Sequence, residues 1–345
     1  YDTAGRQRFM LDATGALAEW RYDGAGRVTD TIAYGQRPPA TTTTETALSV
    51  LANAQPAVDV RRTQSAYDAS GRLQVRTDAL NKTESFTYDG ADRLLTRTDR
   101  NNSVWTYQYD ASGRRTAELS PQVSVSSVDS TGVVSTATRS IATRFTYDAL
   151  GNVRTRTDNA DAPVTADRRT TTYAYDNRGY QVSTIFPDAG SYNVTTNALD
   201  ATGVQATIEI TYNALGQAVV QKDVRNNYSY KAYDALGRVT HEVDQENNVS
   251  SYSYNAFGEV TSMRRFATTL NTGVIAGWTA GQALSTAQLQ TVGGIVDNAN
   301  DRTIDTAYTA LGQKASVTQS QVTYYRNDGS VASGSPVKTF GYNVF

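Results

Sequence analysis

A short motif recurs along this chain at a nearly constant spacing, and it constrains the fold more than any other feature. Its clearest copy is Tyr-Asp-Ala-Leu-Gly-Arg, from Tyr233 to Arg238. The copies that begin at positions 67, 88 and 109 are 21 residues apart, as are those at 212, 233 and 254. A fixed period of this size is typical of repeat proteins, in which each unit buries its apolar face by stacking on its neighbours.

The tyrosine, the turn aspartate and the glycine of each copy are the residues that we expect to define the repeat. In chain order they are Tyr22, Asp23, Gly26, Tyr67, Asp68, Gly71, Tyr88, Asp89, Tyr109, Asp110, Gly113, Tyr147, Asp148, Gly151, Tyr175, Asp176, Gly179, Tyr212, Gly216, Tyr233, Asp234, Gly237, Tyr254 and Gly258. Further copies begin at Tyr1 and Tyr308, and the chain closes on the start of another at Tyr342.

Each copy predicts a strand, a tight turn and a second strand. Asp suits the first position of a type I turn, where its carboxylate accepts backbone hydrogen bonds, and Gly suits the fourth, where a positive φ is often needed. Asp234 and Gly237 stand at these two positions. Apolar and polar residues alternate beside the turns, as in Trp105, Tyr107 and Tyr109, which is typical of half-buried strands.

A second turn is expected to close each unit. Asp78 and Asn81, and likewise Asp244 and Asn247, lie between successive tyrosines, and Asx side chains tolerate turn conformations. A single hairpin is marginal in water. We therefore expect the tyrosine ring of one unit to pack on the ring of the next, while its hydroxyl finds a polar partner. The fold class that follows is all-β: repeated antiparallel hairpins that form one continuous sheet, spiralling because sheets twist.

We expect a single repeat domain over residues 1–345, with inserts where the spacing between tyrosines lengthens. The inserts fall at about 36–60, 117–142, 158–170, 187–205 and 264–302. Residues 122–138 predict a longer hairpin that turns at Asp129–Gly132, and Leu199–Gly203 predicts a shortened turn.

Two inserts contain patterns typical of short helices. In the first, Thr43 or Thr44 is expected to cap a helix over Thr46–Asn53, which ends before Pro56. In the last, residues 279–292 predict a helix. A capping box from Ser285 to Gln288 would begin it there, and Gly293–Gly294 would stop it.

Composition excludes several classes of function. The net charge is −2, which gives no electrostatic basis for binding nucleic acid or an anionic membrane. Cysteine is absent, so disulfides and thiolate metal sites are excluded. No apolar run approaches the roughly 18 residues of a membrane span. The chain begins without Met inside a repeat, and we expect it to be a fragment of a longer protein.

A search for catalytic groups favours structural roles. The one histidine, His241, alternates with Val239 and Val243 and is expected to be a packed sheet residue. The acidic stretches Asp158–Asp161 and Asp297–Asp301 offer oxygen ligands for Ca²⁺, but neither has the Gly and distal Glu of an EF-hand, so loop capping is favoured. We expect no catalytic residue, no cofactor and no metal, and hence no enzyme.

Two residue types suggest binding surfaces instead. Aromatic repeats also occur in carbohydrate-binding modules, which usually depend on Trp at fixed positions. Here only Trp20, Trp105 and Trp278 occur, so packed tyrosines are favoured. An arginine follows the glycine in many copies, namely Arg6, Arg27, Arg72, Arg93, Arg114 and Arg238. Because the net charge is near zero, a solvated or salt-bridged position is favoured over a binding stripe.

The repeated YDALGR and YDASGR sequences, with an Asp…Asn turn between them, resemble the YD-repeat family. That family includes bacterial Rhs proteins, the shell components of insecticidal Tc toxins and the teneurins of animals. Asp167–Thr170 and Asp301–Thr303 resemble the bacterial branch. The resemblance implies a spiral of hairpins that forms a hollow shell, in which bacterial members enclose a toxic C-terminal polypeptide. Members that release this payload carry an Asp-Pro motif, which is absent here.

The function implied by this resemblance is structural. We expect a segment of a shell wall that encapsulates the protein's own C-terminal toxin polypeptide, in a bacterial protein that is secreted or held at the cell surface. A delivery component or a surface glycan is a further expected partner; nucleic acid and a membrane span are not expected. The alternative is an adhesion or carbohydrate-binding module. The two differ in the tyrosine rings, which pack between repeats in a wall and form an exposed row in a binding module.

Overall fold

The computed structural model describes residues 1–37, 44–128, 131–163, 165–190, 192–193, 197–199, 205–271, 273, 275, 277–291, 300–320 and 322–342. The chain divides into two compact units. The first comprises Tyr1–Thr146 and Arg156–Arg169, and the second comprises Tyr147–Thr155 and Thr170–Phe345. The main sheet is antiparallel and has 22 strands, which confirms the expected all-β class. A single repeat domain over residues 1–345 stays a prediction.

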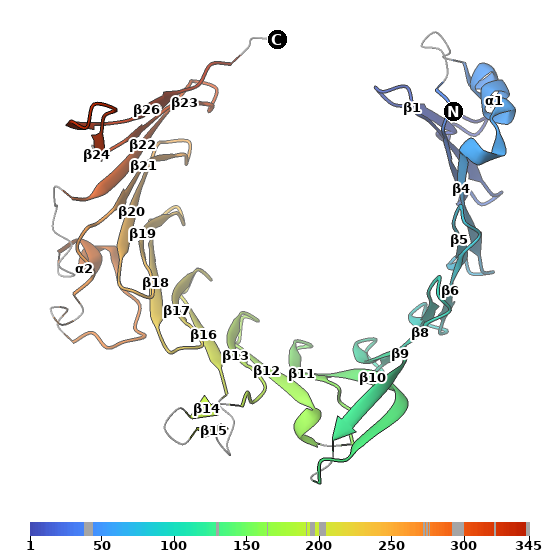
Figure 1. The fold of residues 1–345 in the computed structure, drawn as a ribbon, viewed down its shortest axis with the longest axis horizontal. Helices are drawn as coiled ribbons and strands as arrows, with labels where there is room; N and C mark the ends of the chain where they lie inside the picture. Colours follow the sequence, from blue (N-terminus) through green and yellow to red (C-terminus); the bar gives the residue numbers. More distant parts are fainter. Residues whose placement is uncertain are drawn as a thin grey trace. The chain divides into compact units, whose positions relative to one another are not determined.

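The first unit is a ladder of hairpins in chain order (Figure 1). Each strand from β1 to β9 pairs with the strand that follows it. The strands are β1 (Phe9–Leu11), β2 (Leu17–Tyr22), β3 (Val28–Tyr34), β4 (Val60–Tyr67), β5 (Leu73–Thr77), β6 (Thr83–Tyr88), β7 (Leu94–Thr98), β8 (Val104–Tyr109), β9 (Arg115–Val128) and β10 (Val134–Tyr147); β11 (Val153–Asp158) follows.

The second unit repeats this arrangement. Strand β13 pairs with β12 and β16, the strands from β16 to β23 pair in order, and β23 pairs with β26. The strands are β12 (Arg169–Tyr175), β13 (Gln181–Ile185), β16 (Thr207–Tyr212), β17 (Ala218–Lys222), β18 (Tyr228–Tyr233), β19 (Val239–Val243), β20 (Val249–Tyr254), β21 (Val260–Arg265), β22 (Arg302–Tyr308), β23 (Lys314–Gln319) and β26 (Val337–Thr339). Two separate hairpins, β14 (Tyr192–Asn193) with β15 (Ala198–Leu199) and β24 (Val322–Tyr325) with β25 (Val331–Gly334), stand outside the main sheet.

The turns form as the motif predicts. The glycines of the motif have φ between 76° and 91°, a region that excludes most side chains. The pairing register of the two strands beside such a turn slips by one residue just before the turn, for example between Ala66 and Tyr67. This is the geometry of a type I turn followed by a bulge. In the second turns, Asn81, Asn102, Asn226 and Asn247 take the positive φ, at 59° to 65°.

The first insert adds a helix and a small core. Helix α1 (Glu45–Ala54) begins after Thr44, whose hydroxyl accepts a hydrogen bond from the N–H of Ala47. Leu48 and Ala52 of α1 pack with Leu17, Ile32 and Tyr34 of β2 and β3. A 3₁₀ turn, η1 (Ala57–Asp59), leads from the helix into β4. The predicted helix is therefore confirmed with slightly wider bounds, and Thr43 lies outside the described residues.

The last insert packs a larger core on the second unit. Leu270, Ile275, Leu284 and Leu289 form a cluster with sheet residues that include Val243, which is fully buried. The helix in this insert, α2 (Thr286–Thr291), is shorter than the predicted 279–292, because residues 279–282 form a turn in which Gln282 N–H donates to Thr279 O. The capping box is confirmed, since Ser285 N–H donates to Gln288 and Gln288 N–H donates to Ser285. Gly293–Gly294 lies outside the described residues.

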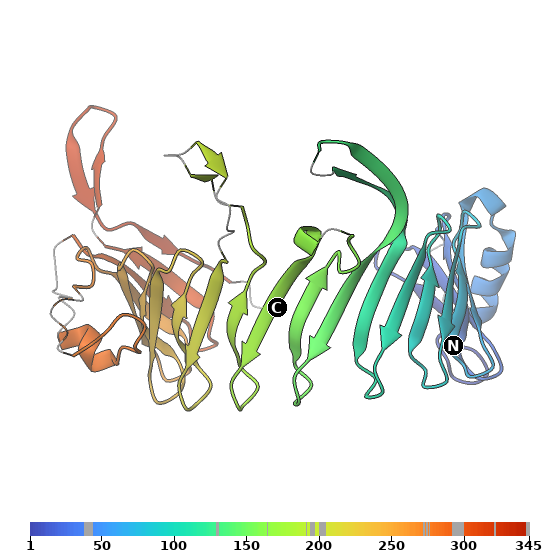
Figure 2. The ribbon, with the colours of Figure 1, turned by 90° about the horizontal axis from the view of Figure 1, so that it is seen from below.

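The remaining inserts are smaller. Strands β9 and β10 run past the neighbouring hairpins (Figure 2), as the predicted long hairpin requires. Of its turn, Asp129 and Ser130 lie outside the described residues, as do residues 200–203 of the predicted shortened turn. The 158–170 insert contains the 3₁₀ turn η2 (Thr165–Asp167). Among the described residues, none of the helices is long and apolar enough to cross a membrane.

Candidate functional site: the joints between repeats

Each motif builds a turn around its aspartate. Asp68 Oδ1 accepts hydrogen bonds from the N–H groups of Ser70 and Arg72, each at 2.9 Å. The same oxygen accepts the same pair of bonds, at 2.8 to 3.0 Å, in Asp23, Asp89, Asp110, Asp148, Asp176 and Asp234. The second oxygen of Asp68 is thereby left to bind the Arg72 guanidinium, at 2.7 Å.

The arginine extends from its own turn to the next repeat. Arg93 is ion-paired with Asp89, and its Nη1 donates to the backbone oxygen of Asp110 in the following motif at 3.0 Å. Its guanidinium lies over the ring of Tyr109, 5.0 Å from the centroid. Arg6, Arg72 and Arg238 do the same: each is ion-paired with the aspartate of its own turn, and each contacts the backbone oxygen and the tyrosine ring of the following motif. One planar cation thus links two successive turns, a role suited to arginine.

The tyrosine completes the joint from the other side. Its hydroxyl donates to the backbone oxygen of the residue that follows the arginine, or that follows whichever residue stands at the arginine's position, as in Tyr109 to Leu94 O at 2.9 Å. The bond recurs at 2.6 to 3.3 Å in Tyr22, Tyr67, Tyr88, Tyr175, Tyr212, Tyr233, Tyr254, Tyr308 and Tyr342. We call the arginine, the tyrosine and their two backbone acceptors an Arg–Tyr joint.

The joints correct the expectation that tyrosine rings pack on one another. At an Arg–Tyr joint, a guanidinium covers the ring where the next tyrosine was expected. A stacked pair of rings occurs where the motif lacks its arginine: Tyr180 follows Gly179 and stacks on Tyr212, with centroids 4.9 Å apart. There Arg178, two residues earlier, donates to Asn213 O instead.

Some joints keep only part of this set. At two turns of the second unit the residue after the glycine is Gln217 or Glu259, and the asparagine of the same turn, Asn213 or Asn255, donates a hydrogen bond to it. The tyrosine hydroxyls of the following repeats, Tyr233 and Tyr308, still reach their carbonyls. The tyrosine bond is therefore the common element of the joints, and the guanidinium is an addition.

The joint geometry lowers the pKa of the turn aspartates. For Asp68 the largest cause is the hydrogen bond from the backbone N–H of Arg72, and the guanidinium of Arg72 adds to it. The pKa values of Asp23, Asp89, Asp110 and Asp234 shift in the same direction for the same largest cause. These carboxylates are charged turn caps rather than proton donors.

The buried carboxylates of Glu84 and Glu19 were not predicted from the sequence. Glu84 is 4% exposed and binds Arg76 at 2.6 Å and Arg97 at 2.8 Å across neighbouring strands. The hydrogen bonds of Arg97 and Arg76 lower the pKa of Glu84 to about 2. Glu19, under α1, binds Arg21 and accepts the hydroxyl of Tyr34. The register between neighbouring strands would have placed each carboxylate beside its arginine partners, but the sequence alone does not provide that register.

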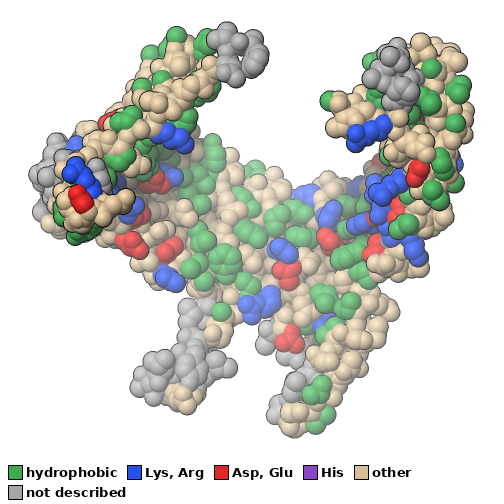
Figure 3. Space-filling model, turned by 45° about the horizontal axis from the view of Figure 1, so that its top comes forward, with side chains coloured by type: hydrophobic (Ala, Val, Ile, Leu, Met, Phe, Trp, Pro, Cys, Tyr) green, Lys and Arg blue, Asp and Glu red, His purple; other side chains and the backbone are tan. Residues whose placement is uncertain are grey.

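The other candidate residues belong to strands or ion pairs. His241 is buried on β19, on the same face as Val243. Asp158 accepts a hydrogen bond from Thr143 and Asp161 is ion-paired with Arg144, while Asp301 is ion-paired with Arg264. Residues 297–299 lie outside the described part of the chain, and within that part no three acidic, His or Cys side chains gather as a metal site would require. On the face drawn in Figure 3, basic side chains lie beside acidic ones.

Comparison with known proteins points to one repeat family. The RHS Repeat profile matches residues 67–103, 88–122 and 233–269. No curated protein matches the chain. A crystal structure of TcdB2-TccC3-Cdc42 is 17% identical over 88% of this chain, with a TM-score of 0.36. One of TcdB2-TccC3 is 16% identical over 94%, with a TM-score of 0.35. The pore of a Photorhabdus luminescens Tc holotoxin with a TccC3 mutation is 16% identical over 92%, with a TM-score of 0.28.

The chain spans 16%, 17% and 20% of the length of these three solved chains. The profile covers the stretches in which the motif is most regular and Arg72, Arg93 and Arg238 form Arg–Tyr joints. The recurring units over residues 67–122 and 233–269 are Rhs repeats, the repeat expected from the resemblance to the YD-repeat family.

Proposed function

We propose that this chain is a non-enzymatic segment of a shell wall, which encloses and protects a C-terminal toxin or effector polypeptide of a secreted bacterial Rhs protein. The observation that carries the proposal is the joint. Every repeat tyrosine whose hydroxyl bond is given above ties its own strand to the backbone of the preceding repeat, so the sheet is reinforced along its length. A long reinforced sheet suits a wall better than a catalytic scaffold.

The mechanism of protection is physical. Proteases bind a substrate backbone in extended form, with its N–H and C=O groups free to pair. In the strands of this sheet those groups are engaged by neighbours on both sides, as in β6 between β5 and β7. A sheet that coils around a polypeptide would therefore resist cleavage itself and deny access to what it encloses.

The alternative, a glycan-binding module that presents a row of aromatic rings, fits the joints less well. The ring of Tyr88 lies under the Arg72 guanidinium and that of Tyr109 under Arg93. Their hydroxyls are bonded to backbone oxygens and do not project as a free row. The rings pack between repeats, which is the arrangement expected of a wall.

Limited proteolysis of the full-length protein tests the proposal. The wild type is compared with Arg72→Ala/Arg93→Ala, which opens two joints, and with Gln217→Ala as a control without a guanidinium. We expect the segment downstream of residue 345 to survive until denaturant unfolds the repeats, and to be cleaved at lower denaturant in the double variant than in the control. Immediate cleavage of that segment, while residues 1–345 persist, would contradict enclosure.

A further inference from the structure

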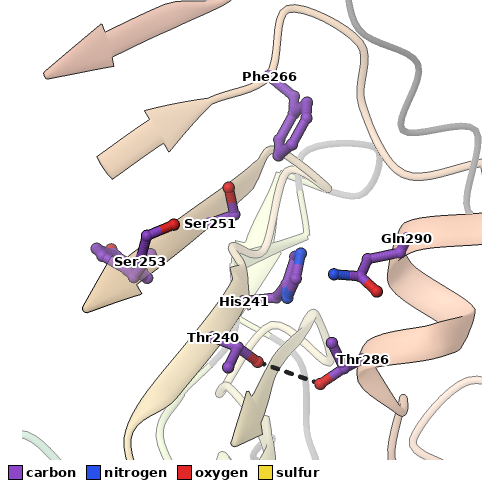
Figure 4. A pocket seen from close by; sticks show the side chains of 8 residues that line it. Thr240, His241, Ser251, Ser253, Phe266, Thr286 and Gln290 are labelled. Atoms are coloured by element: carbon purple, nitrogen blue, oxygen red, sulfur yellow. Dashed lines mark hydrogen bonds between the residues drawn. The ribbon is translucent and has the colours of Figure 1, made fainter. Parts of the chain in front are cut away.

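A pocket of about 300 Å³ lies between β19, β20 and helix α2 of the second unit. Its lining includes His241, Ser251, Ser253, Phe266, Thr286 and Gln290. Figure 4 shows the His241 ring on the strand side directed toward the Gln290 side chain on the helix side. This volume falls at the lower end of ligand pockets, about 300 to 1,000 Å³.

The polar groups that line this pocket are largely without protein partners. His241 is 6% exposed, and its Nδ1 is buried without a hydrogen bond. Among the described residues, the hydroxyls of Ser251 and Ser253 and the amide of Gln290 also have no protein partner. Thr286 bonds to Thr240 across the gap between helix and strand, at 3.1 Å. Ser251 is half-buried and Ser253 and Gln290 are exposed, so the buried group without a partner is the His241 Nδ1. Buried polar groups normally find partners, so an unpartnered one in the wall of a cavity points to a bound molecule.

The chemistry of the lining selects a neutral ligand. None of the lining residues is Lys, Arg, Asp or Glu. Burial lowers the pKa of His241, so its imidazole is neutral at pH 7. A charged ligand would lose hydration here without gaining a counter-ion. Hydroxyls, an amide and an imidazole together donate and accept hydrogen bonds, and Phe266 supplies an apolar wall.

We propose that this pocket binds a neutral sugar ring. A pyranose presents several hydroxyls around a compact ring with apolar C–H edges, which matches hydroxyl and amide groups beside one aromatic side chain. The site lies on the insert side of the sheet and uses none of the joint residues. It therefore adds a recognition function to the proposed wall and does not depend on enclosure.

The single histidine makes the test specific. Its ring resonances in an NMR spectrum of the whole chain arise from one residue, His241. We would titrate D-glucose, D-galactose and N-acetylglucosamine into the protein at millimolar concentrations, with the open-chain polyol sorbitol as a control. We expect at least one of the three sugars to shift the His241 ring signals with saturation, and sorbitol to leave them unchanged.

Two neighbouring serines provide matched variants. Ser251 lines the pocket, whereas Ser250 pairs with Glu242 and Arg265 and points to the opposite face of β20. Ser251→Ala should weaken binding of the responding sugar about two- to tenfold, the loss of one hydrogen bond, whereas Ser250→Ala should not change it. No shift with any of the three sugars, an equal response to sorbitol, or equal effects of the two variants would overturn the proposal.

Discussion

Two stretches of the chain use the same repeat but are stabilised differently. From position 53 to 116 the only buried side chain is that of Glu84, so this stretch has no hydrophobic core of its own, and we call it the bare stretch. It is held by Arg–Tyr joints at Arg72 and Arg93 and by the ion pairs of Glu84. From 212 to 291, which we call the core-backed stretch, residues of the sheet and of the last insert together form a core of ten buried residues. There Gln217 and Glu259 replace two of the arginines.

The difference indicates that Arg–Tyr joints and hydrophobic cores stabilise different stretches of the sheet. Burial of apolar side chains contributes roughly 25 cal/mol per Å² and stabilises a sheet without requiring a particular residue in each turn. A stretch without such a core depends on directional contacts between successive repeats. The motif is therefore most regular where the sheet is bare, and more varied where an insert covers it.

The largest expected effect concerns the core-backed stretch. Leu289 on α2 is fully buried in the cluster on the sheet. Leu289→Ala should destabilise the second unit by about 3 kcal/mol, because a large cavity remains in a packed core. Hydrogen exchange should show the loss in β17–β20 while leaving β5–β8 unchanged. Equal loss of protection in both stretches would mean that the bare stretch relies on the insert core after all.

The next effect concerns the bare stretch. Arg93→Ala removes the ion pair with Asp89, the bond to Asp110 O and the contact with the Tyr109 ring. We expect a loss of about 2 kcal/mol, since a charged hydrogen bond and a cation–π contact disappear together. Urea unfolding measures it, and Gln217→Ala, at the same position of another repeat, serves as the control. A loss no larger than that of the control would remove the distinction between the two kinds of joint.

Acid should weaken the bare stretch through Glu84. Its pKa is lowered to about 2 in the folded protein, below the ordinary value of 4.5, so the unfolded chain binds the proton more readily. The stabilisation is therefore fully present above about pH 4.5 and is lost as pH falls toward 2. Urea midpoints of wild type and Glu84→Gln should differ at neutral pH and converge in acid. A difference that stays constant with pH would show that Glu84 acts by packing alone.

The smallest expected effect is a gain. Asn213→Asp with Gln217→Arg restores the regular motif in a joint that lacks it, and gives Tyr233 a guanidinium partner. We expect a stabilisation of about 0.5 kcal/mol, because the core beneath already holds this stretch and the new pair is partly exposed. Thermal unfolding against each single variant would detect it. Destabilisation would show that this joint has diverged too far to accept the arginine.

The repeat itself was predictable from the sequence, and the joints only in part. The period, the turns at Asp68 and Gly71, and the all-β class follow from residues close in the chain, whose preferences are local. The contact between Arg72 and Tyr88 was not predicted, because it depends on how successive hairpins twist and stagger. Aromatic residues so regularly spaced suggested ring stacking, and the arginine between the rings is evident only in three dimensions.

The inserts show a second limit of prediction from the sequence. The alternation of Val239, His241 and Val243 predicted which face the histidine occupies, and the structure confirms that it is buried. Which segment would cover it was not predictable, because residues 264–302 have no strong periodicity and their packing depends on the sheet beneath. The capping box at Ser285 and Gln288 could be predicted from the sequence, because capping is a contact between residues three apart.

A double-mutant cycle on Arg93 and Tyr109 tests the central claim most directly. The variants are Arg93→Ala, Tyr109→Leu and the pair, with unfolding free energies measured in urea. If the guanidinium and the ring form one joint, the losses should not add, and the coupling should be about 1 kcal/mol. Strict additivity would mean that the two side chains act independently, and that the Arg–Tyr joint does not hold successive repeats together.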